Sequence, residues 1–402
     1  MSRGLGDVYK RQTDKLSFYA RGGYYDNKTR RPYEAYDYNI LHETFNYGIG
    51  AQYMINKGNY ITADCYADHF SSSYCFFKDN KTYNGKAGEE QVRKRTRNHN
   101  LSIKGIFKLG NRHKLSVGTE YIVDVLKSQT DNIAKEDAYT LALFAQDEIK
   151  LLRNLQALIG VRYIYHENFK NHATPNVALM YKPGKFNFRA SYAAGFRTPT
   201  LSELYATDIA KKNDRLTIGN LDLKPEKNNY FSLSAEYVHE RFSVSVNAFY
   251  NNIRDMIDYN TIATGDKAME QYGHKEVRQR DNIAEAKVHG INVSANAYLG
   301  AGFNLSGGYT HLNTQDVELE QPIDKSIKNA YNINAQWAHS WKIYRLNINL
   351  NGRFNSKRFS KSYGYAPEYQ LWNLNTRHSF NLKSVIIEPG CGMENLFDYM
   401  DD

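Results

Sequence analysis

Tyrosine, arginine and lysine recur together in several segments that lie between runs of alternating polarity. An aromatic ring attracts a cation through its face, and a guanidinium group donates charge-assisted hydrogen bonds to an anion. Together these groups suit an anionic, conjugated ligand such as a ferric catecholate. The candidate ligand-binding residues are Arg31, Tyr33, Tyr36, Tyr83, Arg93, Arg95, Tyr272, His274, Arg278, Tyr363 and Tyr365.

The same side chains have an alternative role at a membrane surface. There, cations pair with the phosphates of outer-leaflet lipopolysaccharide, and tyrosines form an interfacial girdle. The formal charge of +9, from 52 Lys and Arg against 43 Asp and Glu, is compatible with either partner. We expect no nucleic acid, because the basic residues are spread over loops and do not gather on one face.

Sequence patterns for covalent or metal catalysis are missing. The chain has no Gly-x-Ser-x-Gly motif, no phosphate-binding glycine loop and no His-Glu-x-x-His motif. His42 and Glu43 begin the last of these, but Asn46 stands where the second histidine is needed. Cys65 and Cys75 fall on one expected strand, roughly 33 Å apart at about 3.3 Å per residue, so they cannot bridge. We therefore expect no enzyme activity, no metal site and no cofactor.

The elements that must position the loops are strands. In residues 345–355, leucine, isoleucine and phenylalanine alternate with asparagine and arginine, which is typical of a two-faced strand. Similar runs predict about 17 strands, including 242–257, 283–299 and 384–396. No run approaches the apolar length of a transmembrane helix.

Short turns and long loops alternate along the whole chain. The long loops are expected at 26–39, 78–96, 126–137, 166–173, 196–228, 258–282, 313–327 and 356–367. Outer-membrane barrels show this asymmetry, with short periplasmic turns on one rim, an apolar face toward lipid and a polar face toward the lumen. The alternative is a soluble all-β sandwich or propeller, although an asparagine-rich face does not suit a packed interior.

Two pairs of motifs carry a family resemblance. Residues 194–205 read AGFRTPTLSELY and residues 219–226 read GNLDLKPE, which resembles the "GFR-x-P-x-x-x-E-L-Y … N-P-x-L-x-P-E" block of TonB-dependent outer-membrane receptors. Residues 249–257 and 394–398 look like the "FYN-x-I-x-D-x-I" and "EN-L/I-F-D" segments of the same family. The resemblance covers residues 13–402. The residues that match are Phe196, Arg197, Pro199, Glu203, Leu204, Tyr205, Asn220, Leu223, Pro225, Glu226, Asn395, Phe397 and Asp398.

We expect these motif residues to serve mainly the architecture of the rim, with direct ligand contact as the alternative. Pro199 and Pro225 bracket a long loop and end strand pairing, because proline donates no ladder hydrogen bond. Glu203 and Glu226 are expected to bridge to Arg or Lys on neighbouring strands or on a plug domain.

The resemblance implies an all-β fold, a transmembrane antiparallel up-and-down β-barrel. The family barrel has about 22 strands around an N-terminal plug that contacts TonB. The chain would then hold about 17 of them, with the plug, the first few strands and the last strand missing. Residues 1–12 lack both the alternation and the apolar region of a signal peptide. We interpret them as non-native or disordered, which leaves one partial barrel domain over 13–402.

The resemblance also implies a function. It predicts a monomeric receptor in the outer membrane of a Gram-negative bacterium that imports a metal chelate, foremost a ferric siderophore. TonB would drive import through the missing plug. Haem and cobalamin receptors of the family stay open, although residues 200–219 contain no histidine and Leu221 replaces the motif proline. Outside the family, the alternative is a passive porin or surface-binding barrel.

Overall fold

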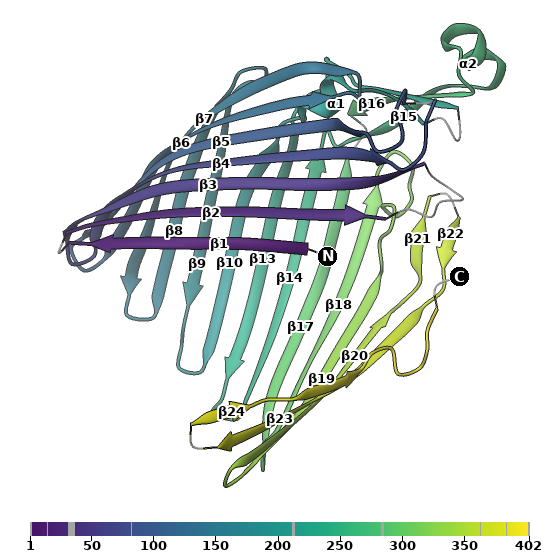
Figure 1. Cartoon of the computed structure of the whole chain (residues 1–402). Coiled ribbons are helices and arrows are strands. Elements are labelled where there is room, and N and C mark those ends of the chain that lie inside the picture. The colour runs from purple at the N-terminus through teal and green to yellow at the C-terminus, as the bar shows by residue number, and fades with distance from the viewer. Residues whose placement is uncertain are drawn as a thin grey trace.

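The computed structural model describes residues 2–400 except 14, 31–36, 82, 211–213, 283–284, 362 and 383, and it describes residues 2–12 as backbone only. Long strands dominate this part of the chain, and helices occur only in loops (Figure 1). None of the described helices is both long and apolar enough to cross a membrane.

One large antiparallel sheet forms the body of the molecule. Its first strands are β1 (Ser2–Gln12), β2 (Leu16–Thr29), β3 (Tyr38–Asn56), β4 (Asn59–Phe76), β5 (Glu90–Leu109), β6 (His113–Ser128), β7 (Ile133–Leu152), β8 (Leu155–His166), β9 (Lys170–Tyr181) and β10 (Phe186–Arg197). Its later strands are β13 (Glu226–Val238), β14 (Phe242–Arg254), β17 (Ala286–Gly300), β18 (Phe303–Asp316), β19 (Asn329–Trp341), β20 (Tyr344–Asn355), β23 (Tyr369–Leu382), β24 (Val385–Ile387) and β25 (Gly390–Met393).

Each strand of this sheet pairs with the next one in this order, from β1 to β23, and β24 and β25 both pair with the last edge of β23. The all-β, up-and-down prediction is therefore confirmed. The sheet has 19 strand segments, which span it as 18 strands because β24 and β25 share one edge. Within the described residues no pairing closes the sheet, and Figure 1 shows an open, strongly curved wall.

The strand β1 is additional to the 17 strands that the sequence predicts. It pairs with β2 from Ser2 opposite Asn27 to Gln12 opposite Ser17. Because residues 1–12 lack alternation, the sequence predicts a barrel that begins only at residue 13. The origin of residues 1–12, native or foreign, stays a prediction from their composition.

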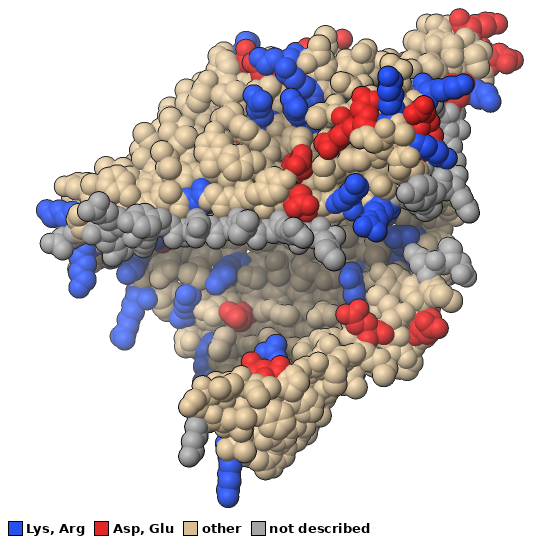
Figure 2. All heavy atoms as spheres, in the orientation of Figure 1, with Lys and Arg blue, Asp and Glu red and all other residues tan. Residues whose placement is uncertain are grey.

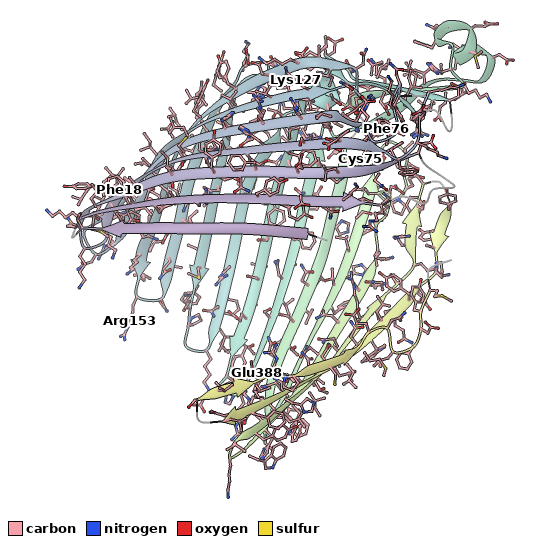
Figure 3. All side chains as sticks on the ribbon, viewed as in Figure 1. Phe18, Cys75, Phe76, Lys127, Arg153 and Glu388 are labelled. Carbon is pink, nitrogen blue, oxygen red and sulfur yellow. The ribbon has the colours of Figure 1, made fainter. Side chains whose placement is uncertain are left out.

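The two faces of the sheet differ in polarity. Along β5, Leu101 and Ile103 are 49% and 45% exposed, whereas Asn100 and Ser102 point to the opposite face. Phe18 lies on the same face as Leu101 and points away from the wall (Figure 3). Covering the exposed half of one such leucine or isoleucine with an apolar medium stabilises the fold by about 1 kcal/mol, so lipid contact favours this face.

The long connections lie at one rim of the sheet, and turns such as Lys57–Gly58 and Lys342–Ile343 lie at the other. Two of the predicted long loops are wrong, at 126–137 and at 166–173. Ser128 pairs with Ile133, and His166 pairs with Lys170, so β6–β7 and β8–β9 end in tight hairpins. The ends of these strands are rich in polar residues and lack a clear alternation, although Leu126 and Ile133 are buried there, and this composition predicted loops.

Two predicted strands are interrupted. The run 242–257 ends as β14 at Arg254, because Asp255 adopts a left-handed φ of 56° that extended pairing does not allow. The run 384–396 divides into β24 and β25 around Pro389, which has no N–H for the ladder.

Two loops fold together, which the sequence analysis did not predict. The connection after β10 holds α1 (Leu201–Tyr205), β11 (Thr207–Ala210) and β12 (Arg215–Ile218), and the one after β14 holds β15 (Ile257–Thr264), α2 (Gly265–Tyr272) and β16 (Glu276–Asn282). They form one sheet in the order β11–β12–β16–β15, in which β12 runs parallel to β16. Ala268 and Val277, both 0% exposed, form its small core. A further hairpin joins β21 (Arg358–Ser360) and β22 (Gly364–Ala366).

Candidate functional site

The family motif forms an ion-pair network at the loop-bearing rim. Arg197 is the last residue of β10, and Glu226 is the first residue of β13. The Arg197 guanidinium donates at 2.6 and 2.8 Å to Glu226 and at 2.8 and 3.3 Å to Glu203 in α1. Glu226 Oε1 also accepts the backbone N–H of Ile257 at 2.8 Å. One arginine thus ties two wall strands to both folded loops.

Helix α1 is held by a capping box. The Thr200 hydroxyl accepts the N–H of Glu203 at 3.2 Å, and the Glu203 carboxylate accepts the N–H of Thr200 at 2.8 Å. Leu204 then packs with Leu223 and Ile257 in a cluster whose members are each under 9% exposed. Burial opposes ionisation of Glu203, but hydrogen bonds from Arg197 and Thr200 outweigh it and lower the pKa of this carboxyl group.

The remaining motif residues also make local contacts. Phe196 stacks on His172 with ring centroids 4.5 Å apart. The Asn220 side chain accepts the N–H of Asp222 at 2.9 Å. Asn395 bonds twice to the backbone of Tyr399, and Phe397 meets Trp372 edge-on. These contacts fit the architectural role that we expect, which stays a prediction.

An aromatic cluster lies at the loop-bearing ends of other strands, on the polar face of β3 and β4. Tyr38 stacks on Tyr74 with ring centroids 4.1 Å apart and meets Phe76 edge-on at 5.8 Å. Tyr83, from the loop 77–89, meets both Tyr38 and Tyr74 edge-on, at 5.6 and 5.1 Å. Burial raises the pKa of the Tyr83 phenol, so this group stays protonated at neutral pH and can donate a hydrogen bond.

Arg93 lies over this cluster. Its guanidinium carbon is 5.3 Å from the centre of the Tyr74 ring and 5.0 Å from that of Tyr83, and its Nη1 donates to Gln129 at 2.9 Å. Its Nε is buried and has no hydrogen-bond partner within the described residues. None of the ion pairs between described residues includes Arg93. Its charge is therefore matched by ring faces and an amide rather than by a carboxylate.

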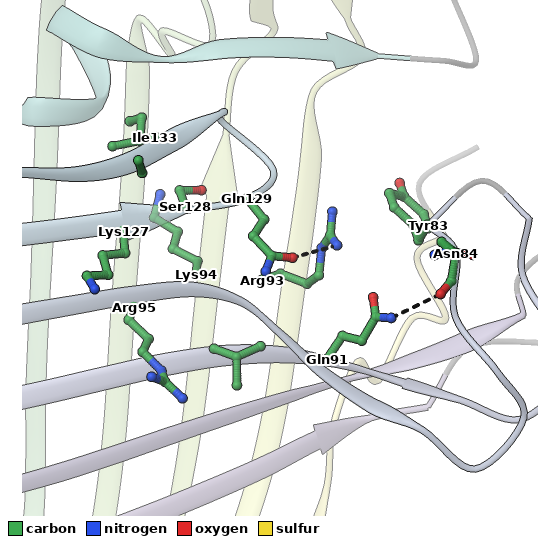
Figure 4. Close-up of a pocket in the computed structure, with 12 residues that line it drawn as sticks. Tyr83, Asn84, Gln91, Arg93, Lys94, Arg95, Lys127, Ser128, Gln129 and Ile133 are labelled. Atoms are coloured by element: carbon green, nitrogen blue, oxygen red, sulfur yellow. Dashed lines mark hydrogen bonds between the residues drawn. The ribbon is translucent and has the colours of Figure 1, made fainter.

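A hollow of about 650 Å³ opens beside Arg93, between the loop 77–89 and the ends of β5, β6 and β7 (Figure 4). Lys94 lies in its lining and binds Asp131 at 3.3 Å. Gln91 donates to the carbonyl of Asn84 at 3.2 Å, which fixes the loop against β5. The hollow thus offers cations, the ring of Tyr83 and amides together, a combination that suits an anionic ligand.

A β-bulge separates Arg93 from Arg95. Ser72 pairs with Lys94 but Ser73 pairs with Val92, so Arg93 is an extra residue in β5. It therefore leaves the alternation and lies over Tyr74, while Arg95 stays on the face of Leu101.

The other predicted ligand-binding residues are dispersed. Arg31, Tyr33 and Tyr36 lie outside the described residues. Tyr272, His274 and Arg278 lie in the folded loops, where His274 contacts Asp214 at 2.9 Å and Arg278 binds Glu276 at 2.6 Å. Tyr363 and Tyr365 belong to the β21–β22 hairpin and are 92% and 61% exposed. Of the predicted residues, only Tyr83, Arg93 and Arg95 line one hollow.

Sequence reasoning missed several polar residues of the folded loops. A smaller hollow of about 160 Å³ is lined by Arg215, Asp208 and Tyr259, which were missed, and by Arg280 from a loop that the sequence marks as rich in cations. Arg280 lies 3.6 Å from the Tyr259 ring centre. Tyr74 was missed as well, because it falls inside a predicted strand. The described residues contain no group of three His, Cys, Asp or Glu side chains arranged to hold a metal ion.

Comparison with known proteins places this geometry in a family. The ferric enterobactin receptor of Pseudomonas aeruginosa is 22% identical over 333 residues, which cover 72% of this chain and 44% of that protein. A probable hemoglobin and hemoglobin-haptoglobin-binding protein of Haemophilus influenzae is 28% identical over 165 residues, covering 38% of this chain and 16% of that protein. The chain therefore spans less than half the length of these relatives.

A crystal structure of a mutant of the Pseudomonas aeruginosa ferric enterobactin receptor superposes with a TM-score of 0.80 at 16% identity, covering 99% of this chain and 64% of that one. At this identity the likeness shows the fold.

The sequence profile described as "TonB dependent receptor-like, beta-barrel" matches residues 2–390. Barrels of this kind reside in the outer membrane of Gram-negative bacteria and belong to transporters, not to enzymes. The chain therefore belongs to the TonB-dependent receptor-like β-barrel family.

Proposed function

We propose that this chain is the barrel of a receptor that imports a ferric siderophore of the catecholate type, driven by TonB through a plug domain. The observation that carries the proposal is Arg93, which lies over Tyr74 and Tyr83 beside a hollow of about 650 Å³. A ferric tris-catecholate is anionic and has flat aromatic rings. It can accept hydrogen bonds from the guanidinium group and stack on tyrosine.

The relatives support the transport of an iron compound but differ in ligand. One is named a ferric enterobactin receptor, whereas another is named for hemoglobin and its haptoglobin complex. The second name makes haem uptake from hemoglobin the second candidate function. The iron of haem is usually held by an axial histidine, and the lining of the candidate hollow contains no histidine.

The experiment compares ligands on the receptor expressed from its natural gene. Binding of ⁵⁵Fe-labelled tris-catecholate, haem and hemoglobin is measured on purified receptor, for the wild type and for Arg93→Gln. The matched control is Lys104→Gln, which removes one charge from the same strand at a site whose side chain has no described ion pair. Loss of a charge-assisted hydrogen bond should weaken tris-catecholate binding about tenfold or more in Arg93→Gln and leave the control unchanged.

The second part of the experiment measures uptake as growth of iron-limited cells. Iron-limited cells that lack the gene should lose growth on the ferric tris-catecholate, and cells that lack TonB should lose it as well. Equal growth with and without the gene would overturn the transport function. If the receptor binds haem or hemoglobin more tightly than tris-catecholate, the proposed ligand is wrong. The proposed transport function would still hold.

A further inference from the structure

The turn-bearing rim of the wall, opposite the loop-bearing rim, is rich in cations. Most hairpins at this end of the sheet carry a lysine or an arginine in or next to their tight turn. We call these exposed residues the turn-rim cations, and in chain order they are Lys15, Lys57, Arg112, Arg153, Lys182, Lys185, Arg241 and Lys342. Figure 2 shows Lys and Arg side chains that protrude from this end, and in Figure 3 Arg153 points away from the end of its hairpin.

Few carboxylates are placed to neutralise the turn-rim cations. None of the ion pairs between described residues includes one of them. Asp147 and Glu148 lie near this rim, but His113 and Lys114 contact them at 2.6 and 3.0 Å. In the tight turns themselves, Glu240 is the one carboxylate among the described residues. At the loop-bearing rim, by contrast, Asp and Glu gather among the cations (Figure 2). The turn-bearing rim therefore carries a positive charge that a partner from outside the chain can match.

Aromatic side chains fix the depth of this rim in a membrane. Four of them lie at the turn-bearing ends of their strands and are 42% to 45% exposed: Tyr181, Phe186, Phe242 and Trp341. All four belong to the apolar face that carries Leu101. Rings in this position lie at the level of the lipid headgroups.

Each of these four rings has a turn-rim cation as its neighbour in the chain, on the side of the turn. The neighbours are, in the same order, Lys182, Lys185, Arg241 and Lys342. One residue of a strand spans about 3.3 Å, and the polar layer of a bilayer extends about 5 to 8 Å beyond the hydrocarbon. A lysine or arginine that extends from an interfacial ring therefore reaches the phosphates of this layer. The depth of the cations favours lipid headgroups over a partner that lies farther from the membrane.

The distribution of the turn-rim cations also fits a lipid leaflet. Their turns belong to hairpins from β1–β2 to β19–β20, so the cations follow the curved rim (Figure 1). A leaflet surrounds a barrel on all sides, whereas a compact protein covers one side. Short turns of outer-membrane barrels lie on the periplasmic side, so the leaflet that meets this rim is the inner one, which consists of phospholipids.

We propose that the turn-rim cations bind the headgroups of anionic phospholipids in the inner leaflet of the outer membrane, with Lys182 and Lys185 as the strongest site. These two lysines share one turn, around Pro183 and Gly184, so both can reach one phosphate. Each cation near an anionic membrane surface contributes about fivefold in binding, so the two together give about 25-fold. The site lies at the opposite end of the strands from Arg93 and shares no residue with the hollow beside it.

The test titrates full-length receptor in a non-ionic detergent with phospholipid, and native mass spectrometry counts the bound molecules. The probes are phosphatidylglycerol and phosphatidylcholine with identical acyl chains, which differ in net charge. The variant Lys182→Gln/Lys185→Gln is compared with Lys182→Arg/Lys185→Arg, which keeps both charges. The matched control, Lys325→Gln/Lys357→Gln, loses the same charge from exposed loop residues at the other rim. A further variant carries glutamine in place of all turn-rim cations.

For the first bound lipid, wild type should prefer phosphatidylglycerol over phosphatidylcholine about 25-fold in Kd. The preference should fall to about fivefold in Lys182→Gln/Lys185→Gln, because the remaining turns offer one cation each. It should persist in the charge-keeping variant and in the loop control, and it should vanish when all turn-rim cations are replaced. Heat-modifiable migration checks that each variant is folded, and the double variant decides the matter if the fully substituted one does not fold.

Equal affinity of wild type for the two phospholipids would overturn the proposal, as would an unchanged preference in the folded double variant. Isolated peptidoglycan, which is also polyanionic, is the competing probe. If the double variant no longer sediments with peptidoglycan but keeps its preference for phosphatidylglycerol, the rim binds the cell wall and the lipid site is wrong.

Discussion

Two arginines at the same rim differ in what surrounds their charge. Arg197 donates four hydrogen bonds to the carboxylates of Glu203 and Glu226, whose side chains are only 13% and 17% exposed. Arg93 donates to one amide and lies over two tyrosine rings. The first cation is neutralised within the protein, whereas the second keeps a positive field that an anion can use. The difference separates an arginine held in an ion-pair network from the one that we propose to bind the ligand, although both belong to loop-rim segments.

The largest effect on the contrast between the two arginines is expected from Arg197→Met. The change leaves two partly buried carboxylates without their cation, so we expect the rim to lose about 2 kcal/mol. This value is below the range for fully buried pairs because Arg197 is 42% exposed. Hydrogen exchange over residues 198–226 measures the loss. Arg189→Met, on the same strand, is the control. Unchanged protection in Arg197→Met would show that the network does not hold the loops.

A smaller effect is expected from Tyr83→Leu. This change removes one ring under Arg93 and one stacking surface from the hollow, so tris-catecholate affinity should fall about tenfold. Tyr83→Phe keeps the ring and should stay within about threefold of wild type. Equal losses in the two variants would mean that the hydroxyl, and not the ring, serves the ligand.

Thr200→Ala tests the capping box without touching the ion pairs. Loss of this cap should destabilise α1 by about 1 kcal/mol, measured as faster exchange of the Glu203 and Leu204 amides. Thr200→Ser restores the hydroxyl and should restore protection. If hydrogen exchange of these two amides is unchanged in Thr200→Ala, the capping box does not stabilise α1, and the ion pairs of Arg197 hold the helix.

The smallest effect is the pH dependence of the same helix. Because the pKa of Glu203 is lowered in the folded protein, its stabilisation is complete above the ordinary pKa of a glutamate and is lost as pH falls through the folded value. Protection of α1 against exchange, corrected for intrinsic rates, should therefore decline on acidification in wild type. Glu203→Gln should be less protected at neutral pH and show a flatter profile. Parallel pH profiles of protection in the wild type and in Glu203→Gln would contradict the assignment of this pH dependence to Glu203.

Much of the fold could be predicted from alternation. The run 345–355 corresponds to β20, and the asymmetry between the two rims is confirmed. The hairpins at 129–132 and 167–169 could not be predicted, because the strand ends beside them are rich in polar residues, lack a clear alternation and resemble loops. The sheet formed by two loops was missed for another reason. Its parallel pair, β12 and β16, joins residues about 60 positions apart, and no local pattern encodes that contact.

The candidate site was predictable only in part. Composition indicated Tyr83 and Arg93, but strict alternation would put Arg93 and Arg95 on one face. The bulge opposite Ser72 and Ser73 separates them, and nothing in the sequence of β5 marks it. Tyr74 joins the site because β3 and β4 pair in a register that brings it beside Tyr38. Such a contact depends on pairing and not on residue type.

The pairing of β12 with β16 also has an evolutionary consequence. Arg215 lies opposite Glu276 and Ile218 lies opposite Gln279, so each of the two loops supplies an inner strand to the other. A gene exchange that replaced one loop alone would leave its partner with an unpaired strand edge and an uncovered small core. Variants of this receptor that escape antibodies or change ligand should therefore acquire both loops together. In sequence comparisons, the two segments should diversify as one inherited block.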